Sequence, residues 1–128
     1  MEFPDNLFYS DDHEWVRDEK DQVTIGITDY AQNQLKDIVY VDLPEIGSEF
    51  KKGESMGVVE SVKTVADIFA PISGKIIEKN MELKDHPEWV NTDPYGKGWF
   101  LRMEPKDRDE LKALLSSTSY QGVISKES

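Results

Sequence analysis

Histidine and cysteine, the side chains that most often serve as bases, nucleophiles or metal ligands, are scarce in this sequence. Two histidines, His13 and His86, are present and there is no cysteine, so a catalytic triad or a multi-histidine metal site has few members to draw on. His13 lies between Asp12 and Glu14, a set that could bind a metal, but clustered acids on an acidic chain are more often solvated surface. His86 precedes a proline and is expected in a loop. A small hydrolase that uses one of these histidines is an alternative.

The lack of cysteine has a wider consequence, because disulfides, thiolate nucleophiles and thiol redox chemistry all require this residue. Any reactive sulfur must therefore be attached to the chain from outside. The phosphate-binding patterns G-x-x-x-x-G-K-[ST] and G-x-G-x-x-G do not occur either. The three tryptophans are widely separated, which favours packing in the core or at its rim over a ligand box: Trp15, Trp89 and Trp99.

One lysine, Lys63, lies where the local pattern is hard to explain. Runs with strand character precede and follow it, at 55–60 and 65–70, yet none of the usual turn residues, Gly, Asn, Asp or Pro, stands between them. Propensity alone would extend a single strand through Lys63. Two interpretations are open on the residues alone: an ordinary exposed lysine, or a lysine set apart for a chemical task.

The charge balance limits the classes of partner. Fifteen Lys and Arg against 26 Asp and Glu give a formal net charge of −11 on 128 residues, so nucleic acid and anionic membrane surfaces would repel the chain. The length predicts a single domain over 1–128, with its core at about 7–116. No apolar run approaches the roughly 18 residues of a transmembrane helix, and the first residues lack the character of a targeting segment. A cytoplasmic protein is expected, or a mitochondrial matrix protein if the chain is a processed organellar form.

The hydrophobic pattern predicts many short strands separated by turn residues, which is typical of a barrel or a sandwich. The strand-like runs are 13–17, 22–28, 38–43, 55–60, 65–70, 75–80 and 98–103. A helix of about two turns is expected from Asp29, with Thr28 as its N-cap. Asp107 and Glu110 resemble a second helix start, before leucines that would cover an open edge of the barrel. Residues 117–128 are expected to form a tail that partly frays.

The Lys63 segment resembles a known attachment motif. Glu60-Ser61-Val62-Lys63, with Pro71 and Gly74 downstream, is similar to the lipoyl attachment region of the glycine cleavage system H protein family. Other motifs follow in that family's order and spacing: His13-Glu14-Trp15, Gly26-Ile27-Thr28, Leu43-Pro44-Glu45-Ile46-Gly47, Asp93-Pro94-Tyr95 and Gly98-Trp99. The resemblance covers nearly the whole chain. It implies a mainly β fold, a lipoyl-domain-like barrel-sandwich hybrid with a short internal helix and a C-terminal helix.

The resemblance also implies the cofactor, lipoate, joined to Lys63 through an amide. Biotin acceptor lysines typically have Met on both sides, whereas Lys63 has Val62 and Thr64, so lipoate is favoured. Many family members have two small residues after the lysine, and this chain has Thr64 and Val65 there. Because β-branched residues suit a strand, we expect attachment to survive this departure.

The family's activity implies a carrier that is not itself an enzyme. Its lipoyl arm takes the aminomethyl group of glycine from glycine decarboxylase, passes it to an aminomethyltransferase and is reoxidised by dihydrolipoyl dehydrogenase. Lipoate-attaching enzymes are further partners. Two alternatives within carriers stay open: a lipoyl donor or relay protein similar to the H protein, and a carrier of another lipoate-dependent route such as sulfur oxidation.

Acidic positions of the family motif suggest how the loaded arm is held. The arm ends in an amine that is cationic at neutral pH, and a carboxylate in a surface cleft could hold it and limit attack by water. Glu14 and Asp67 match such positions, and the hypothesis is that one or both receive the amine; solvated surface is the alternative for each. Glu60, Ser61 and Val62 complete the attachment motif, with Glu60 and Ser61 either recognised by the attaching enzyme or merely polar strand residues.

Overall fold

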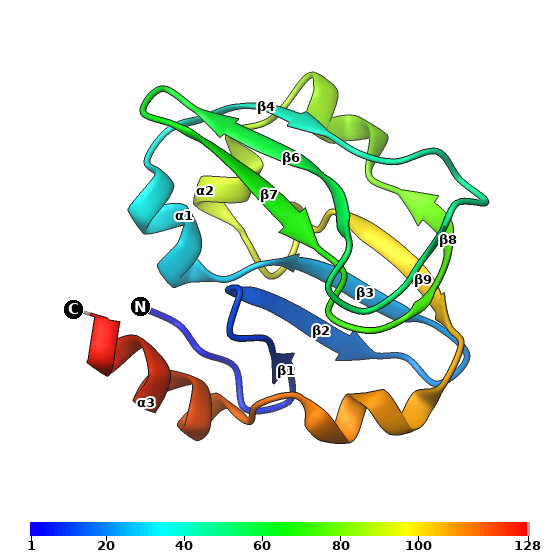
Figure 1. The fold of residues 1–128 in the computed structure, drawn as a ribbon. Coiled ribbons are helices and arrows are strands. Elements are labelled where there is room, and N and C mark those ends of the chain that lie inside the picture. Colours follow the sequence, from blue (N-terminus) through cyan, green and yellow to red (C-terminus); the bar gives the residue numbers. More distant parts are fainter. Residues whose placement is uncertain (128) are drawn as a thin grey trace.

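Two antiparallel sheets pack around a shared apolar core (Figure 1). The computed structural model describes residues 1–127. One sheet has the strand order β1 (Phe8–Tyr9), β2 (Glu14–Asp18), β3 (Val23–Ile27), β9 (Leu101–Pro105), β8 (Gly74–Lys79) and β5 (Glu49–Phe50). The other has the order β4 (Ile38–Asp42), β6 (Ser55–Ser61) and β7 (Val65–Phe69). The predicted mainly β architecture is confirmed.

Residues of both sheets form the core, so each sheet turns one face toward the interior. Val16 and Ile25 pair across β2 and β3, and both are fully buried. From the smaller sheet, Val59 and Ile68 point into the same cluster. Alternate residues of β7, such as Asp67, are exposed, as expected for strands that cover a core with one face only. The smaller sheet therefore presents a solvent-facing side.

The internal helix begins as the sequence predicted. Thr28 caps α1 (Asp29–Leu35), and its hydroxyl accepts a hydrogen bond from the Ala31 N–H at 3.2 Å. The helix ends at Lys36, which has a positive φ of 69°. Two further short helices, which the strand pattern did not indicate, lie between β8 and β9: the 3-10 helix η1 (Met81–Lys84) and α2 (Trp89–Thr92).

The C-terminal helix is present, but it lies later in the chain than the Asp107 signal indicated. Asp107 caps a 3-10 helix, η2 (Arg108–Ala113), and α3 (Ser117–Glu127) follows it. Most of the expected tail is thus helical, while Ser128 lies outside the described residues. Tyr120 of α3 is fully buried and stacks on Tyr9 at 4.9 Å between ring centroids. This contact anchors α3 to the larger sheet.

The structure also bears on the last predicted strand and on the three tryptophans. The last strand begins at Leu101, three positions after the predicted run started at Gly98. Trp15 is fully buried, and Trp89 and Trp99 pack at the edge of the core, so the packing interpretation of the tryptophans is confirmed. Within residues 1–127, no helix has the length and apolar character that crossing a bilayer requires.

Candidate functional site

Lys63 lies at the tip of the β6–β7 hairpin, in a turn held by one side chain. The Ser61 hydroxyl accepts hydrogen bonds from the backbone N–H groups of Lys63, at 3.1 Å, and of Thr64, at 3.0 Å. The Ser61 N–H also donates to the Thr64 carbonyl at 2.8 Å. A serine that binds its own local backbone replaces the glycine or asparagine of an ordinary turn. Ser61 therefore forms the turn for which the sequence offered no Gly, Asn, Asp or Pro.

Two contacts fasten this tip to the end of α1. The Val62 N–H donates to the Asp37 carbonyl at 3.0 Å, and the Lys63 ammonium donates to the Gln34 carbonyl at 3.4 Å. The second contact places a cation at the carbonyl end of a helix, where the helix dipole favours it. Both Lys63 and Gln34 are exposed, so water and an approaching protein can reach the amine.

The remaining motif residues differ in their surroundings. Val62 is 68% exposed at the tip. Glu60 is half-buried and pairs with Tyr40 on one side and Val65 on the other. Ser61 has the turn-forming role described above, which sequence reasoning had not assigned. The hairpin thus keeps a defined shape around an accessible lysine.

Glu14 is a buried carboxyl at the start of β2, and its side chain contacts β7. Its Oε1 accepts from the Ser10 hydroxyl at 2.8 Å and its Oε2 from the Phe69 N–H at 3.0 Å. The residue is only 1% exposed. Burial raises the pKa of the Glu14 carboxyl to about 8, although both hydrogen bonds oppose this shift, and Asp12 and Asp11 add a smaller increase. Glu14 is therefore closed to solvent in this state.

Asp67 differs from Glu14 in its exposure to solvent. It is exposed, and its Oδ1 accepts a hydrogen bond from the Ser55 hydroxyl at 3.1 Å. It lies two residues before Phe69, whose backbone binds Glu14. Glu14 of β2 therefore contacts β7, the strand that carries Asp67, but of the two predicted acids only Asp67 faces solvent. Asp67 is four residues from Lys63, roughly 13 Å at the usual rise of a strand.

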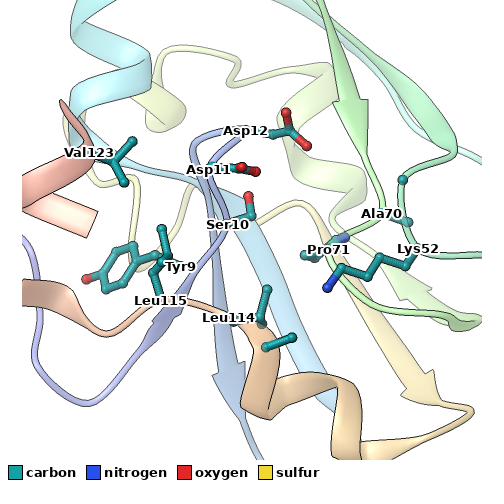
Figure 2. A pocket seen from close by; sticks show the side chains of 12 residues that line it. Tyr9, Ser10, Asp11, Asp12, Lys52, Ala70, Pro71, Leu114, Leu115 and Val123 are labelled. Carbon is teal, nitrogen blue, oxygen red and sulfur yellow. The ribbon is translucent and has the colours of Figure 1, made fainter. Parts of the chain in front are cut away.

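A cavity of about 290 Å³ lies near the other end of β7, beyond Ala70. Ser10, Asp11 and Asp12 line one side of it, and Figure 2 shows the Lys52 side chain extending toward the space between Ser10 and Leu114. Of the residues proposed for lipoate attachment and for holding the arm, which are Glu14, Glu60, Ser61, Val62, Lys63 and Asp67, none lines this cavity. Ala70 is seven residues from Lys63, roughly 23 Å along a strand, which separates the cavity from the hairpin tip.

The two histidines have structural partners. His13 lies 2.9 Å from the Tyr120 hydroxyl through Nδ1 and 3.3 Å from a Glu127 carboxylate oxygen through Nε2. His86 is exposed and stacks on Trp89, with ring centroids 4.4 Å apart. In the described part of the chain, histidines and acidic residues form no group of three or more that could hold a metal ion. His13 therefore serves to fasten α3.

Comparison with known proteins shows what the chain resembles as a whole. The family model for the glycine cleavage H-protein matches residues 7–127. Glycine cleavage system H proteins of Anaeromyxobacter sp. (strain K) and Thermus thermophilus are each 51% identical to the chain, and the alignments cover 97% and 99% of both partners. The crystal structure of a glycine cleavage system H protein from Mycobacterium marinum is 40% identical, with a TM-score of 0.84, and the match covers 93% of this chain and 96% of that chain.

Proposed function

The chain belongs to the glycine cleavage H-protein family, and from this premise we propose that Lys63 is the residue that carries its lipoyl group. Membership of the family supports a lipoyl carrier role in glycine cleavage. The observation that carries the assignment to Lys63 is its place at an exposed hairpin tip, within a turn that Ser61 holds in shape. Lipoate attached there would supply the dithiolane sulfur that a chain without cysteine lacks.

The residues around Lys63 fit an acylated lysine. The exposed amine has room for an acyl chain, and its present partner, the Gln34 carbonyl, can accept equally from an amide N–H. Acylation removes one positive charge, so the carrier becomes one unit more negative than its formal −11. The Ser61 hydroxyl bonds only to the backbone of the tip, so acylation leaves the turn intact.

Asp67 is the carboxylate best placed to hold the cationic end of a loaded arm. It is exposed, lies on the strand that leaves the tip, and accepts a hydrogen bond from the Ser55 hydroxyl at 3.1 Å. A carboxylate and an ammonium group form a charge-assisted hydrogen bond, which is stronger than a neutral one. Glu14 reaches the arm only if its hydrogen bond with Phe69 opens, because its side chain is buried. Asp67 is therefore the first contact in this proposal, and Glu14 a second one after local opening.

The proposed partners follow from the family. They are glycine decarboxylase, an aminomethyltransferase, dihydrolipoyl dehydrogenase and the enzymes that attach lipoate, with the chain acting as a non-catalytic carrier in the cytoplasm. A relay of lipoyl groups to other proteins, or service in a different lipoate-dependent route, would use the same tip. Genes for the decarboxylase and the transferase beside the gene of this chain would favour glycine cleavage over these alternatives.

Reconstitution tests the function. The lipoylated protein is mixed with the three partner enzymes, and release of CO2 from glycine is followed with the natural chain, with Lys63→Arg and with Lys52→Arg as a matched control. Turnover with the natural chain and the control, and none with Lys63→Arg, is expected. Turnover with Lys63→Arg would contradict the assignment of the attachment residue, and a lipoylated natural chain that supports no turnover would contradict the role in glycine cleavage.

A further inference from the structure

Apolar side chains gather on the surface around Lys63. Among the described residues, four large hydrophobic side chains near the tip are about half exposed or more: Val39 at 50%, Tyr40 at 49%, Val62 at 68% and Val65 at 57%. We call these four residues the apolar collar. Exposed apolar groups that cluster on a chain otherwise rich in charge are typical of a surface that another protein covers.

Strand register explains why the collar faces outward. Tyr40 pairs with Glu60, and Glu60 pairs with Val65, so these residues form one row across β4, β6 and β7. The pairing shifts between Ile38 and Tyr40, as at a β-bulge, which can turn two consecutive side chains toward the same side. Ile38 remains buried, while Val39 and Tyr40 are both exposed. The irregularity thus exposes two apolar residues beside the tip.

Val62, at the tip itself, is also exposed. Its backbone N–H is held by the Asp37 carbonyl, at 3.0 Å, while its side chain stays in solvent. Carboxylates lie within and beside the collar. Asp37 lies beside Val62, and Glu60 lies between Tyr40 and Val65. In the next row, Asp42 and Asp67 pair with Val58 from its two sides. The surface is therefore apolar with an acidic border, and its residues Val62 and Val65 lie on either side of Lys63 in the hairpin.

We propose that the apolar collar is the docking surface of the enzyme that acylates Lys63, and that this enzyme presents an apolar face with a basic border around its acyl donor. This inference rests on the proposed attachment of lipoate to Lys63. An enzyme that reaches the Lys63 amine must cover the residues on either side of it, so the collar is continuous with the site of the reaction. The acidic border is complementary to basic residues, which steer association and fix orientation.

The chemistry of the transfer explains why an apolar contact is useful. The Lys63 amine must lose a proton to become a nucleophile, and exclusion of water around an amine favours its neutral form. In the transfer, Nζ forms a C–N bond to the carbonyl carbon of an activated lipoyl group, such as the acyl adenylate that forms from lipoate and ATP. The activating group leaves that carbon, and the amine proton passes to a base of the enzyme. A collar that is sealed against an apolar face would keep water from the amine during this step.

The test measures lipoylation of the unmodified chain by a lipoate ligase supplied with free lipoate and ATP. The double variant Tyr40→Thr/Val65→Thr keeps residues that favour strands but makes two of the four collar residues polar. The apparent KM for the carrier should rise roughly tenfold, because apolar anchors at the centre of an interface contribute most of its affinity. The conservative pair Tyr40→Phe/Val65→Ile should restore the natural KM. Ile46→Thr, at a residue that is 58% exposed outside the collar, is the matched control.

Separate outcomes test the collar and the attachment residue. A natural KM in the double variant, with circular dichroism and thermal unfolding unchanged, overturns the collar as a docking surface and leaves Lys63 as the acceptor. An equal rise in KM for Ile46→Thr also overturns it, because the effect would then follow from any lost apolar surface. A natural chain that the ligase modifies at another lysine contradicts the attachment residue itself.

Discussion

The backbone N–H of Phe69 donates a hydrogen bond of 3.0 Å to the buried carboxyl of Glu14, and this bond joins β2 of the larger sheet to β7 of the smaller one. Phe69 lies on the strand that leaves the Lys63 tip, two residues after the exposed Asp67. The contact thus connects the core to the surface that a loaded arm would follow. The strength of this hydrogen bond depends on the Glu14 carboxyl, whose pKa lies well above the usual value for glutamate.

The first prediction concerns pH and Glu14. The folded chain holds the Glu14 pKa at about 8, above the ordinary value of 4.5, so between these values the folded state binds more protons than the unfolded state. The contribution of Glu14 to the free energy of unfolding is then fully present below pH 4.5 and is lost as pH rises toward 8. Urea unfolding should show that the natural chain loses roughly 2–4 kcal/mol more over this range than Glu14→Gln does. Parallel pH profiles of the two proteins would contradict the raised pKa.

A second prediction concerns the turn. Ser61→Ala removes the hydroxyl that accepts from the Lys63 and Thr64 N–H groups, whereas Ser61→Thr retains a hydroxyl. Because the tip is exposed, the loss in global stability should be small, on the order of 1 kcal/mol. Amide hydrogen exchange at Lys63 and Thr64 should become at least severalfold faster in Ser61→Ala. Exchange as slow as in the natural chain would show that Ser61 does not hold the turn.

Retention of the aminomethyl group gives a third prediction. Lipoylated and loaded Asp67→Asn should release formaldehyde severalfold faster than the natural chain in the absence of the transferase, because the carboxylate no longer holds the cationic amine. Asp42→Asn is the matched control, since Asp42 and Asp67 both pair with Val58 from opposite sides of β6. Glu14→Gln tests the second carboxyl in the same assay. Release at the natural rate from both Asp67→Asn and Glu14→Gln would remove both acids from the proposal.

A fourth prediction concerns the attachment of α3. The Tyr120 hydroxyl lies 2.7 Å from the Thr28 hydroxyl and 2.9 Å from Nδ1 of His13, and Tyr120 is fully buried. Tyr120→Phe keeps the ring but removes the hydroxyl that contacts Thr28 and His13, which should lower the free energy of unfolding by roughly 1–3 kcal/mol. Tyr40→Phe, on the surface, should change it by less than about 0.5 kcal/mol. Thermal unfolding of the two variants tests the difference, and equal midpoints would contradict it.

Local signals in the sequence were sufficient for several elements. Thr28 marks a helix start because a hydroxyl that accepts from the first turn is a local feature. The hairpin around Lys63 was hidden, because a serine hydroxyl forms its turn where glycine or asparagine was expected. Asp107 is a real cap, but the helix it starts is a short 3-10 helix. Residues beyond 116 are helical because Tyr120 packs on Tyr9, a contact between distant positions that local pattern does not contain.

The candidate site was predictable only in part, because the accessibility of its residues depends on contacts between positions far apart in the chain. The resemblance to the family, and not any local pattern, led to the proposal of Lys63, Glu14 and Asp67. The burial of Glu14 depends on Ser10 and Phe69, and the second of these lies 55 positions away in the chain. The exposed collar depends on strand register and on the irregular pairing at Ile38 and Tyr40. The sequence therefore indicated which residues to propose, whereas their accessibility required the fold.

The most direct test of the central claim is the intact mass of the protein purified from its own source, with the modified peptide sequenced. We predict a mass greater than that of the 128-residue chain by one lipoyl group, with the group located on Lys63 and absent from Lys63→Arg expressed in the same cells. A native protein with the mass of the unmodified chain, or a lipoyl group on a different lysine, would contradict the account.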